Sequence, residues 1–129
     1  QALGCGLKEG DVYLTAGMSR LEMEDARRAL PYFQRAVELK EDDVEARFQY
    51  GLALARLEHI DEAIGQFEKV IERDSRHADA YFNLGVAHAY KKHPHEALTM
   101  FEKALDIQPD HVLAANGKKN ITTLLSDTD

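Results

Sequence analysis

Apolar residues return along this chain at a fixed interval of 34 positions. Glycine stands at three positions separated by that interval, which are Gly17, Gly51 and Gly85. Further columns in the same step are Ala29, Ala63 and Ala97; Leu30, Ile64 and Leu98; Phe33, Phe67 and Phe101; Ala36, Val70 and Ala104; and Val37, Ile71 and Leu105. A strict period of this length predicts stacked copies of one supersecondary unit, each burying its apolar face against its neighbours.

The second half of each repeat has the pattern of a surface helix. Apolar residues in the range 60–73 recur three and four positions apart, and polar residues fill the other positions. Residues 94–107 follow the same plan, with Pro94 in the first turn, where proline is tolerated. In the first repeat, Pro31 falls a short way into the equivalent helix. It has no amide hydrogen to donate, so we expect it to delay or kink the start of that helix.

The first half of each repeat predicts a helix with two apolar stripes. Residues 44–57 are apolar nearly all round, which is unusual for a surface helix. The stripe expected to face the core is Ala46, Tyr50, Gly51 and Leu54. The second stripe is Glu45, Phe48, Leu52 and Ala55, and it recurs as Asp11, Leu14, Met18 and Leu21 and as Asp79, Phe82, Val86 and Ala89. Glycine costs roughly 1 kcal/mol inside a helix relative to alanine, so the glycine column predicts close approach of the partner helix.

The two ends of the chain depart from the repeat. Residues 112–125 predict a last helix, a polar cap of the kind that repeat arrays need. Its expected packing residues are Val112, Ala115, Leu124 and Leu125, and its expected water-facing residues are Asn116, Lys118, Lys119 and Asn120. Residues 1–9 have the pattern of the tail of an earlier, truncated repeat. The expected organisation is thus one domain over residues 1–129, with repeats at 10–43, 44–77 and 78–111 followed by the cap.

Composition narrows the class of partner. The chain has 129 residues and a net charge of −7, which argues against a nucleic-acid surface and favours basic partners. A single cysteine, Cys5, excludes an internal disulfide and fits a reducing compartment. The sequence has no apolar run long enough for a membrane span, so we expect no membrane partner.

The columns resemble those of the tetratricopeptide repeat (TPR) family, a helix–turn–helix unit of this period. Tyr13 and Tyr81 occupy the column of its early aromatic residue, and Pro109 that of its closing proline. The departures from the family pattern are Arg20, Glu41, Arg47 and Ser75. The runs ALPYFQRAVEL, EARFQYG and ALDIQPDH are similar, more narrowly, to the Bacillus YrrB-type TPR proteins.

This resemblance implies an all-α fold, a right-handed α-solenoid of antiparallel helix pairs with a C-terminal capping helix. It also implies a cytoplasmic, bacterial protein-interaction module whose first helices line a concave, peptide-binding groove. The second stripe, found from periodicity alone, is the one that the family turns into that groove. The candidate groove residues are Asp11, Leu14, Met18, Glu45, Phe48, Gln49, Leu52, Arg56, Asp79, Phe82, Asn83, Val86 and Tyr90.

The candidate residues suggest how a ligand would be held. The amides of Gln49 and Asn83 can donate to and accept from an extended peptide backbone. The acidic row of Asp11, Glu45 and Asp79 favours Lys or Arg in the ligand. Some family members clamp the C-terminal carboxylate of a ligand with basic residues. Asp79 and Glu45 stand at positions where such a clamp needs Lys, so this clamp is not expected here. Alternatively, curvature of the stack buries most of the second stripe between repeats, as for Leu14, Leu52 and Val86.

Nothing in the sequence indicates catalysis. It contains no nucleotide-binding loop, zinc-protease helix or nucleophile elbow, and Cys5 has no plausible base partner. His88, His93 and His95 lie close in sequence without ligand spacing, so neither a metal site nor a cofactor is expected. The favoured function is a non-enzymatic scaffold that binds a peptide or protein segment, apolar with basic residues. The alternatives are structural self-assembly, in which end faces of the truncated fragment stack head to tail, and an accessory domain of a larger enzyme.

Overall fold

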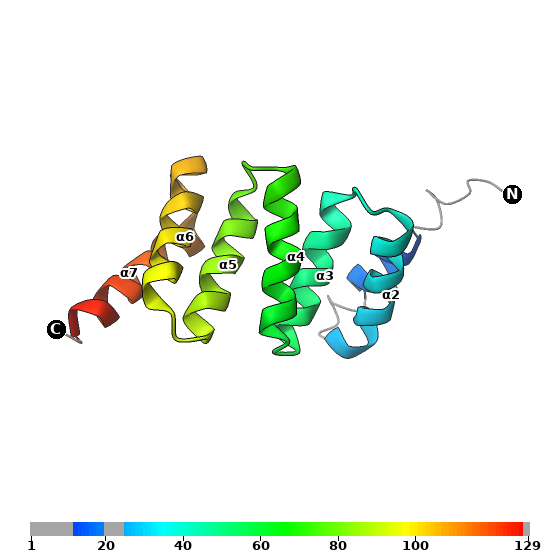
Figure 1. Cartoon of the computed structure of the whole chain (residues 1–129), viewed down its shortest axis with the longest axis horizontal. Coiled ribbons are helices and arrows are strands. Elements are labelled where there is room, and N and C mark those ends of the chain that lie inside the picture. Colours follow the sequence, from blue (N-terminus) through cyan, green and yellow to red (C-terminus); the bar gives the residue numbers. More distant parts are fainter. Residues whose placement is uncertain (1–11, 20–24, 128–129) are drawn as a thin grey trace, which may run out of the picture. The chain divides into compact units, whose positions relative to one another are not determined.

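The computed structural model describes residues 12–19 and 25–127. Every regular element in these two ranges is a helix, so the prediction of an all-α fold is confirmed. Residues 12–19 are helical, and the later helices are α2 (Ala26–Leu39), α3 (Val44–Arg56), α4 (Ile60–Arg73), α5 (Ala78–Tyr90), α6 (Pro94–Ile107) and α7 (Val112–Asp127) (Figure 1). None of them combines the length and apolar character needed to cross a membrane.

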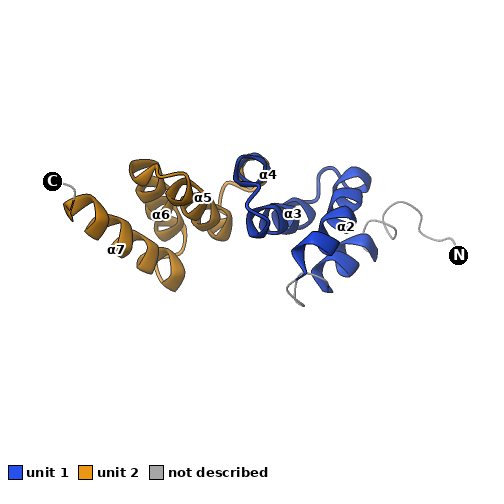
Figure 2. Ribbon diagram, turned by 90° about the horizontal axis from the view of Figure 1, so that it is seen from below, with its two compact units in different colours: residues 1–66 blue, residues 67–129 orange. Residues whose placement is uncertain are grey.

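The chain forms two compact units, residues 1–66 and residues 67–129, whose boundary falls inside α4 (Figure 2). In unit 1, α2 packs against α3. In unit 2, α6 packs against both α5 and α7, and α5 also contacts α7. The expected tail of an earlier repeat at residues 1–9 lies outside the described residues. The division into repeats stays a prediction.

Three helices begin with side-chain caps at positions that follow the sequence period. The cap residues are Asp43, His77 and His111, which are 34 residues apart. Each side chain accepts a hydrogen bond from the backbone amide three residues further on, at 3.3, 3.0 and 3.0 Å respectively. These bonds satisfy amides that a helix N-terminus otherwise leaves without an internal partner. In the two histidines the acceptor is Nδ1, so the ring is neutral and carries its proton on Nε2.

The cap of α3 is electrostatically supported. Partial burial raises the pKa of Asp43, but the hydrogen bond from Lys40 and the backbone amides of Ala46 and Glu45 outweigh burial and lower the pKa below its usual value. The Lys40 ammonium lies 3.0 Å from the Asp43 carboxylate. The capping carboxylate therefore stays ionised at neutral pH, where it also suits the positive end of the helix dipole.

Two turns between helices place a non-glycine residue in the left-handed region. Glu58 has φ of 64° and Lys92, in the same column of the repeat, has φ of 63°. The amide of His59 donates to the Leu54 carbonyl at 2.9 Å, and that of His93 donates to the His88 carbonyl at 2.8 Å. These are the hydrogen bonds of a Schellman helix end, where glycine is the usual residue. Both turns therefore carry backbone strain that a glycine would relieve.

We expect Lys92→Gly to raise the free energy of unfolding by about 0.5–1 kcal/mol, because glycine adopts this conformation without a Cβ penalty. Urea unfolding followed by far-UV circular dichroism would measure the change. The control is Lys91→Gly, since Lys91 has an ordinary φ of −81° and glycine there only adds entropy to the unfolded chain. An unfolding midpoint for Lys92→Gly at or below that of the wild type would contradict the assignment of strain.

Pro31 does not delay the start of α2. The helix begins at Ala26, and Pro31 lies inside it. The carboxylate of Asp25 caps the first turn by accepting from the Arg28 amide at 3.2 Å. The expectation of a late start was wrong, because this cap and the buried side chains of Ala26 and Ala29 hold the first turn ahead of Pro31.

Unit 1 is built around Phe33, whose side chain is fully buried. A Cβ on Gly17 would lie 2.6 Å from the Phe33 ring, so only glycine permits this approach. The buried cluster is Ala26, Ala29, Phe33 and Ala53, and the partly buried residues packed on it are Leu14, Met18, Leu30, Tyr50, Leu52 and Leu57. The close approach expected from the glycine column is confirmed at this position.

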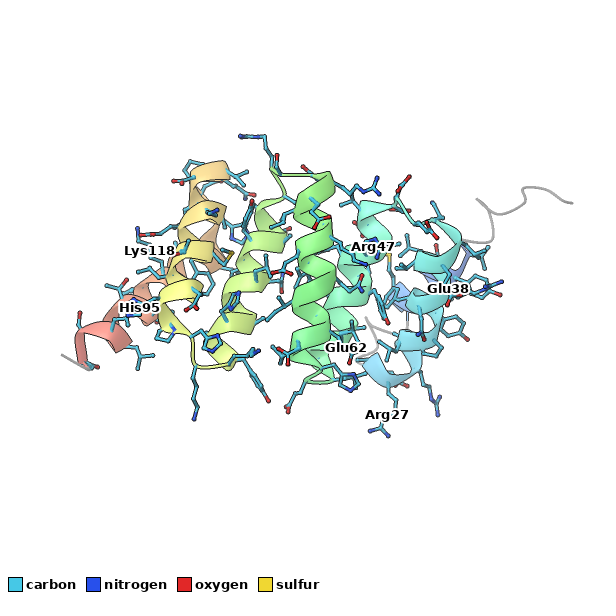
Figure 3. All side chains as sticks on the ribbon, viewed as in Figure 1. Arg27, Glu38, Arg47, Glu62, His95 and Lys118 are labelled. Atoms are coloured by element: carbon cyan, nitrogen blue, oxygen red, sulfur yellow. The ribbon has the colours of Figure 1, made fainter. Side chains whose placement is uncertain are left out.

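Arg47 forms a polar link where the family pattern has an aromatic residue. Its Nε donates to the Glu41 carbonyl at 3.1 Å, and its Nη1 donates to the Gln66 side chain of α4 at 3.1 Å (Figure 3). The guanidinium thus ties the start of α3 both to the preceding turn and to the neighbouring helix. At this position the hydrogen bonds of the guanidinium hold the start of α3, where the family pattern has an aromatic ring.

Unit 2 is built around Phe101 of α6, which is 3% exposed. A Cβ on Gly85 of α5 would lie 2.6 Å from the ring, and a Cβ on Gly117 of α7 would lie 2.7 Å from it. Two different helices therefore approach the same phenylalanine through a glycine. At the surface, the Lys118 ammonium of α7 lies 3.6 Å from the Glu102 carboxylate of α6 (Figure 3).

Candidate functional site

A pocket of about 310 Å³ lies in unit 2 between α5 and α7, with Phe101 of α6 among its walls. Its lining residues are Phe82, Val86 and Ala89 from α5; Phe101 from α6; and Leu113, Asn116, Gly117, Asn120 and Ile121 from α7. The walls are apolar, and the side-chain amides of two asparagines supply the polar atoms. None of these lining residues carries a charge. We call this the α5–α7 pocket.

The wall from α5 is the second stripe of that helix. Leu84 and Ala87 lie between the stripe residues in the sequence of α5; both are 2% exposed and belong to the core. Val86 is 44% exposed, while Phe82 and Ala89 are half-buried and pack on the cluster around Phe101. Because residues three and four apart share a helix face, the two stripes point in different directions. The second stripe of α5 therefore lies at the pocket, on a different face from the buried core positions.

The wall from α7 corrects the expected orientation of that helix. Ala114 and Ile121 are the buried residues of α7. Val112 is 69% exposed, Leu124 is 50% exposed and Ala115 is also exposed, so the expected packing through these three residues was wrong. Leu125 does pack on the cluster around Phe101.

The close approach of Gly117 to Phe101 accounts for this orientation. Ala114, Gly117 and Ile121 are three and four positions apart, so one helix face carries all of them. The four residues of α7 expected to face water, Asn116, Lys118, Lys119 and Asn120, are all exposed, and Asn116 and Asn120 also line the pocket.

A hydrogen bond between Asp79 and His111 joins the first turn of α5 to the start of α7. His111 is 6% exposed, and its Nε2 lies 2.7 Å from Oδ1 of Asp79. Since Nδ1 accepts the Ala114 amide, Nε2 carries the proton and donates to the carboxylate. The imidazole also lies against the Phe82 ring, with ring centroids 5.4 Å apart. His111 thus holds the two walls together at the Phe82 end of the pocket.

The predicted amide residues make hydrogen bonds within their own helices. Nδ2 of Asn83 donates to the Asp79 carbonyl at 2.8 Å. Nε2 of Gln49 donates to the Glu45 carboxylate at 2.8 Å. Each bond uses one of the two amide hydrogens, so a ligand would meet the remaining hydrogen and the amide oxygen.

The candidate residues of unit 1 are covered more than those of unit 2. Leu14, Met18 and Leu52 pack on the cluster around Phe33, which is the burial that the sequence left open as an alternative. Phe48 is half-buried, and Glu45 is exposed. The remaining candidates are Arg56, which borders an open depression with Asp25 and Arg27; Tyr90, which is 56% exposed; and Asp11, which lies outside the described residues.

The α7 half of the pocket was missed from the sequence, although the period contained a signal for it. Adding 34 to the positions of Asp79, Phe82 and Val86 leads to Leu113, Asn116 and Asn120. All three of these α7 residues line the pocket. From Phe82 to Asn116 and from Val86 to Asn120 the chemical type changes from apolar to amide, so a search for apolar residues passes over these two positions.

His59 and His111 each have an acidic partner, Glu62 at 3.3 Å and Asp79 at 2.7 Å respectively. Within residues 12–19 and 25–127, no group of three or more His, Cys, Asp or Glu side chains is placed to hold a metal ion. The rings of His88 and His93 lie with centroids 6.1 Å apart across the turn between α5 and α6. Two rings without further ligands fall short of the three or four protein ligands of a typical zinc site.

The sequence repeats every 34 residues, and in two of the repeats a glycine of one helix lies against a phenylalanine of the next helix. This combination is typical of the TPR-type helical-repeat proteins. The chain belongs to the family described as the Cilia and flagella-associated protein 70 middle TPR-like domain, whose model matches residues 19–127. No curated protein matched the chain. The resemblance to the TPR family, stated from the columns of the sequence, is confirmed.

Solved structures agree with this assignment. YrrB, described as a TPR protein with an unusual peptide-binding site, is 51% identical with a TM-score of 0.84, and the match covers 86% of this chain. The match covers 57% of the YrrB chain, so this chain spans little more than half of its length. The narrower similarity to YrrB is thus also confirmed.

Two more distant structures share the fold alone. The first TPR of Spaghetti (RPAP3), solved with an HSP90 peptide, is 17% identical with a TM-score of 0.88, covering 92% of this chain and 94% of that one. The Arabidopsis OM64 TPR domain is 19% identical with a TM-score of 0.89, covering 92% and 98%. These matches confirm the prediction of a TPR α-solenoid.

Proposed function

We propose that the chain is a non-enzymatic protein-interaction module that binds a peptide or protein segment on the open second-stripe faces of its first helices. The observation that carries this proposal is the α5–α7 pocket of about 310 Å³. Pockets that bind small ligands or side chains are concave and mostly apolar, with a few placed polar groups and volumes from about 300 Å³ upward. Val86 and Leu113, which are 44% and 58% exposed, both line this pocket, and contiguous exposed apolar surface marks interaction sites.

The comparisons support the same class of function. YrrB, at 51% identity, is described as having a peptide-binding site. RPAP3 carries an HSP90 peptide, SRMEEVD, in which three of the last four residues are acidic. Here Asp79 and Glu45 are exposed acidic residues, and the net charge is −7, so we propose that the preferred segments are basic. The proposed setting is the bacterial cytoplasm, which suits a chain with a single cysteine.

A displayed library of random peptides tests this function. We expect the wild-type chain to enrich a defined set of peptides and Val86→Asp to lose most of that set, because a buried carboxylate would be left without a partner. The control is Val112→Asp, since Val112 is 69% exposed and does not line the pocket. Equal enrichment by wild type and Val86→Asp would overturn the assignment of binding to this face.

A further inference from the structure

We infer that the α5–α7 pocket takes one bulky, uncharged side chain of an extended segment, while Asn116 and Asn120 hydrogen-bond the main chain of that segment. A Lys or Arg three residues away completes the ligand by approaching Asp79. This inference rests on the proposed function and names the class of ligand for the same site.

The size and lining of the pocket select the side chain. Its volume of about 310 Å³ is at the small end of ligand pockets, which run to about 1,000 Å³. It accommodates one or two amino-acid side chains and excludes a large cofactor. Phe82, Val86 and Leu113 present only carbon atoms from their side chains, so a charged group entering between them would lose its hydration without gaining a partner. The pocket therefore favours Leu, Ile, Met or Phe.

The spacing of the two asparagines matches an extended chain. Asn116 and Asn120 are one helical turn apart, so they lie about 6 Å from each other along α7. Alternate residues of an extended chain are about 6.6 Å apart, and their amide and carbonyl groups point to the same edge. Each carboxamide offers both a donor and an acceptor. The two side chains can therefore bind residues on either side of the one whose side chain enters the pocket.

The same asparagines argue against a second copy of this chain as the occupant. The regular elements within residues 12–19 and 25–127 are all helices, and a helix satisfies its own backbone groups except at its ends. A helical surface packed on this pocket would cover Asn116 and Asn120 and offer them few main-chain partners. Covered amides without partners are costly, whereas an extended segment supplies unpaired backbone groups.

Asp79 adds charge complementarity at one end of the pocket. Its carboxylate accepts from His111 through Oδ1, yet the side chain is 62% exposed, so the carboxylate remains open to a cation. The contact between the rings of His111 and Phe82 places this group at the Phe82 end. Asp79 and Val86 are seven residues apart on α5, which is about 10 Å along the helix. An extended chain covers that distance in about three residues.

Fluorescence anisotropy with designed peptides tests the inference. The probes are fluorescein-labelled peptides of Gly, Ser and Ala with one central position X, and with Lys or Ala three residues before or after X. We expect Leu or Phe at X to bind roughly tenfold or more tightly than Ala, and Glu at X to bind no better than Ala. In one of the two placements, Lys should add about two- to fivefold over Ala, and high salt should remove this gain.

A double-mutant cycle tests the main-chain contacts. We expect Asn116→Ala with Asn120→Ala to weaken the Leu peptide about tenfold or more. N-methylation of the peptide amides flanking X should cost the wild type a similar factor and cost this double variant almost nothing. Thr122→Ala is the control, because Thr122 is exposed on α7 and does not line the pocket. Full additivity of the two losses would overturn the assignment of the asparagines.

The remaining outcomes separate this inference from the proposed function. If displayed peptides are enriched but Leu, Ala and Glu at X bind alike, the ligand class is wrong and the function stands. If sedimentation shows self-association that Leu113→Asp abolishes and Val112→Asp preserves, the occupant is a second copy and the inference fails. If neither the library nor the designed peptides bind, the proposed function fails together with the inference.

Discussion

Replacing Phe101 with alanine is expected to lower the free energy of unfolding by about 3–5 kcal/mol, the usual cost of deleting a buried aromatic side chain. The ring is 3% exposed and faces Gly85 and Gly117. Neither glycine has a side chain that could turn into the space, so the α5 and α7 backbones at these positions leave the cavity unfilled. The loss should therefore lie toward the upper end of the range.

Urea unfolding followed by circular dichroism measures this loss, and Leu98→Ala provides the comparison within the same cluster. Leu98 is half-buried and packs on the edge of the cluster, so its truncation should cost clearly less. Because Phe101 also lines the α5–α7 pocket, Phe101→Ala should weaken peptide binding as well. A loss of stability below about 1 kcal/mol would show that unit 2 is not organised around this ring.

The contact between glycine and phenylalanine was predictable because it repeats. A helical glycine costs stability wherever it stands, so three glycines in register require one shared reason, and close approach of the next helix is the reason available. The structure shows this approach for Gly17 with Phe33 and for Gly85 with Phe101. A column of identical residues thus carries information about packing that a single position does not.

The orientation of α7 could not be read from its hydrophobicity. Val112 and Leu124 are the obvious apolar candidates, yet the structure leaves both at the surface. Glycine does not count as an apolar position, so the hydrophobic pattern of α7 does not indicate that Gly117 approaches Phe101. The role of His111 was equally hidden, because histidine is not a usual N-cap residue and its partner Asp79 is 32 residues away in sequence.

The second stripe shows the remaining limit of the sequence. Leu52 and Val86 occupy the same column, so periodicity assigns both to one helix face. In the structure, Leu52 packs on the cluster around Phe33, whereas Val86 is 44% exposed. A pattern specifies which face a residue lies on, but the side chains of the neighbouring helices decide how far that face is covered.

Two glycine-to-alanine substitutions are expected to change stability in opposite directions. Gly85→Ala should lower the free energy of unfolding by about 1–3 kcal/mol, because its Cβ would lie 2.6 Å from the Phe101 ring and would force the helices apart. Gly65→Ala should raise it by about 0.5–1 kcal/mol, because that Cβ meets nothing within 4 Å and alanine is the better helix former. Alanine also improves helix propensity at position 85. The net loss expected for Gly85→Ala therefore requires that the clash with Phe101 costs more than this gain.

Urea unfolding of the two variants side by side isolates the clash, since both change the same atoms inside a helix. Combining Gly85→Ala with Phe101→Leu tests whether the clash with the ring causes the loss of stability. The smaller side chain should make Gly85→Ala less damaging in the double variant than in the wild type, whereas the effect of Gly65→Ala should be unchanged. A stabilising effect of Gly85→Ala in the wild-type chain would mean that the glycine column does not report close packing, and the main inference from the repeat would fail with it.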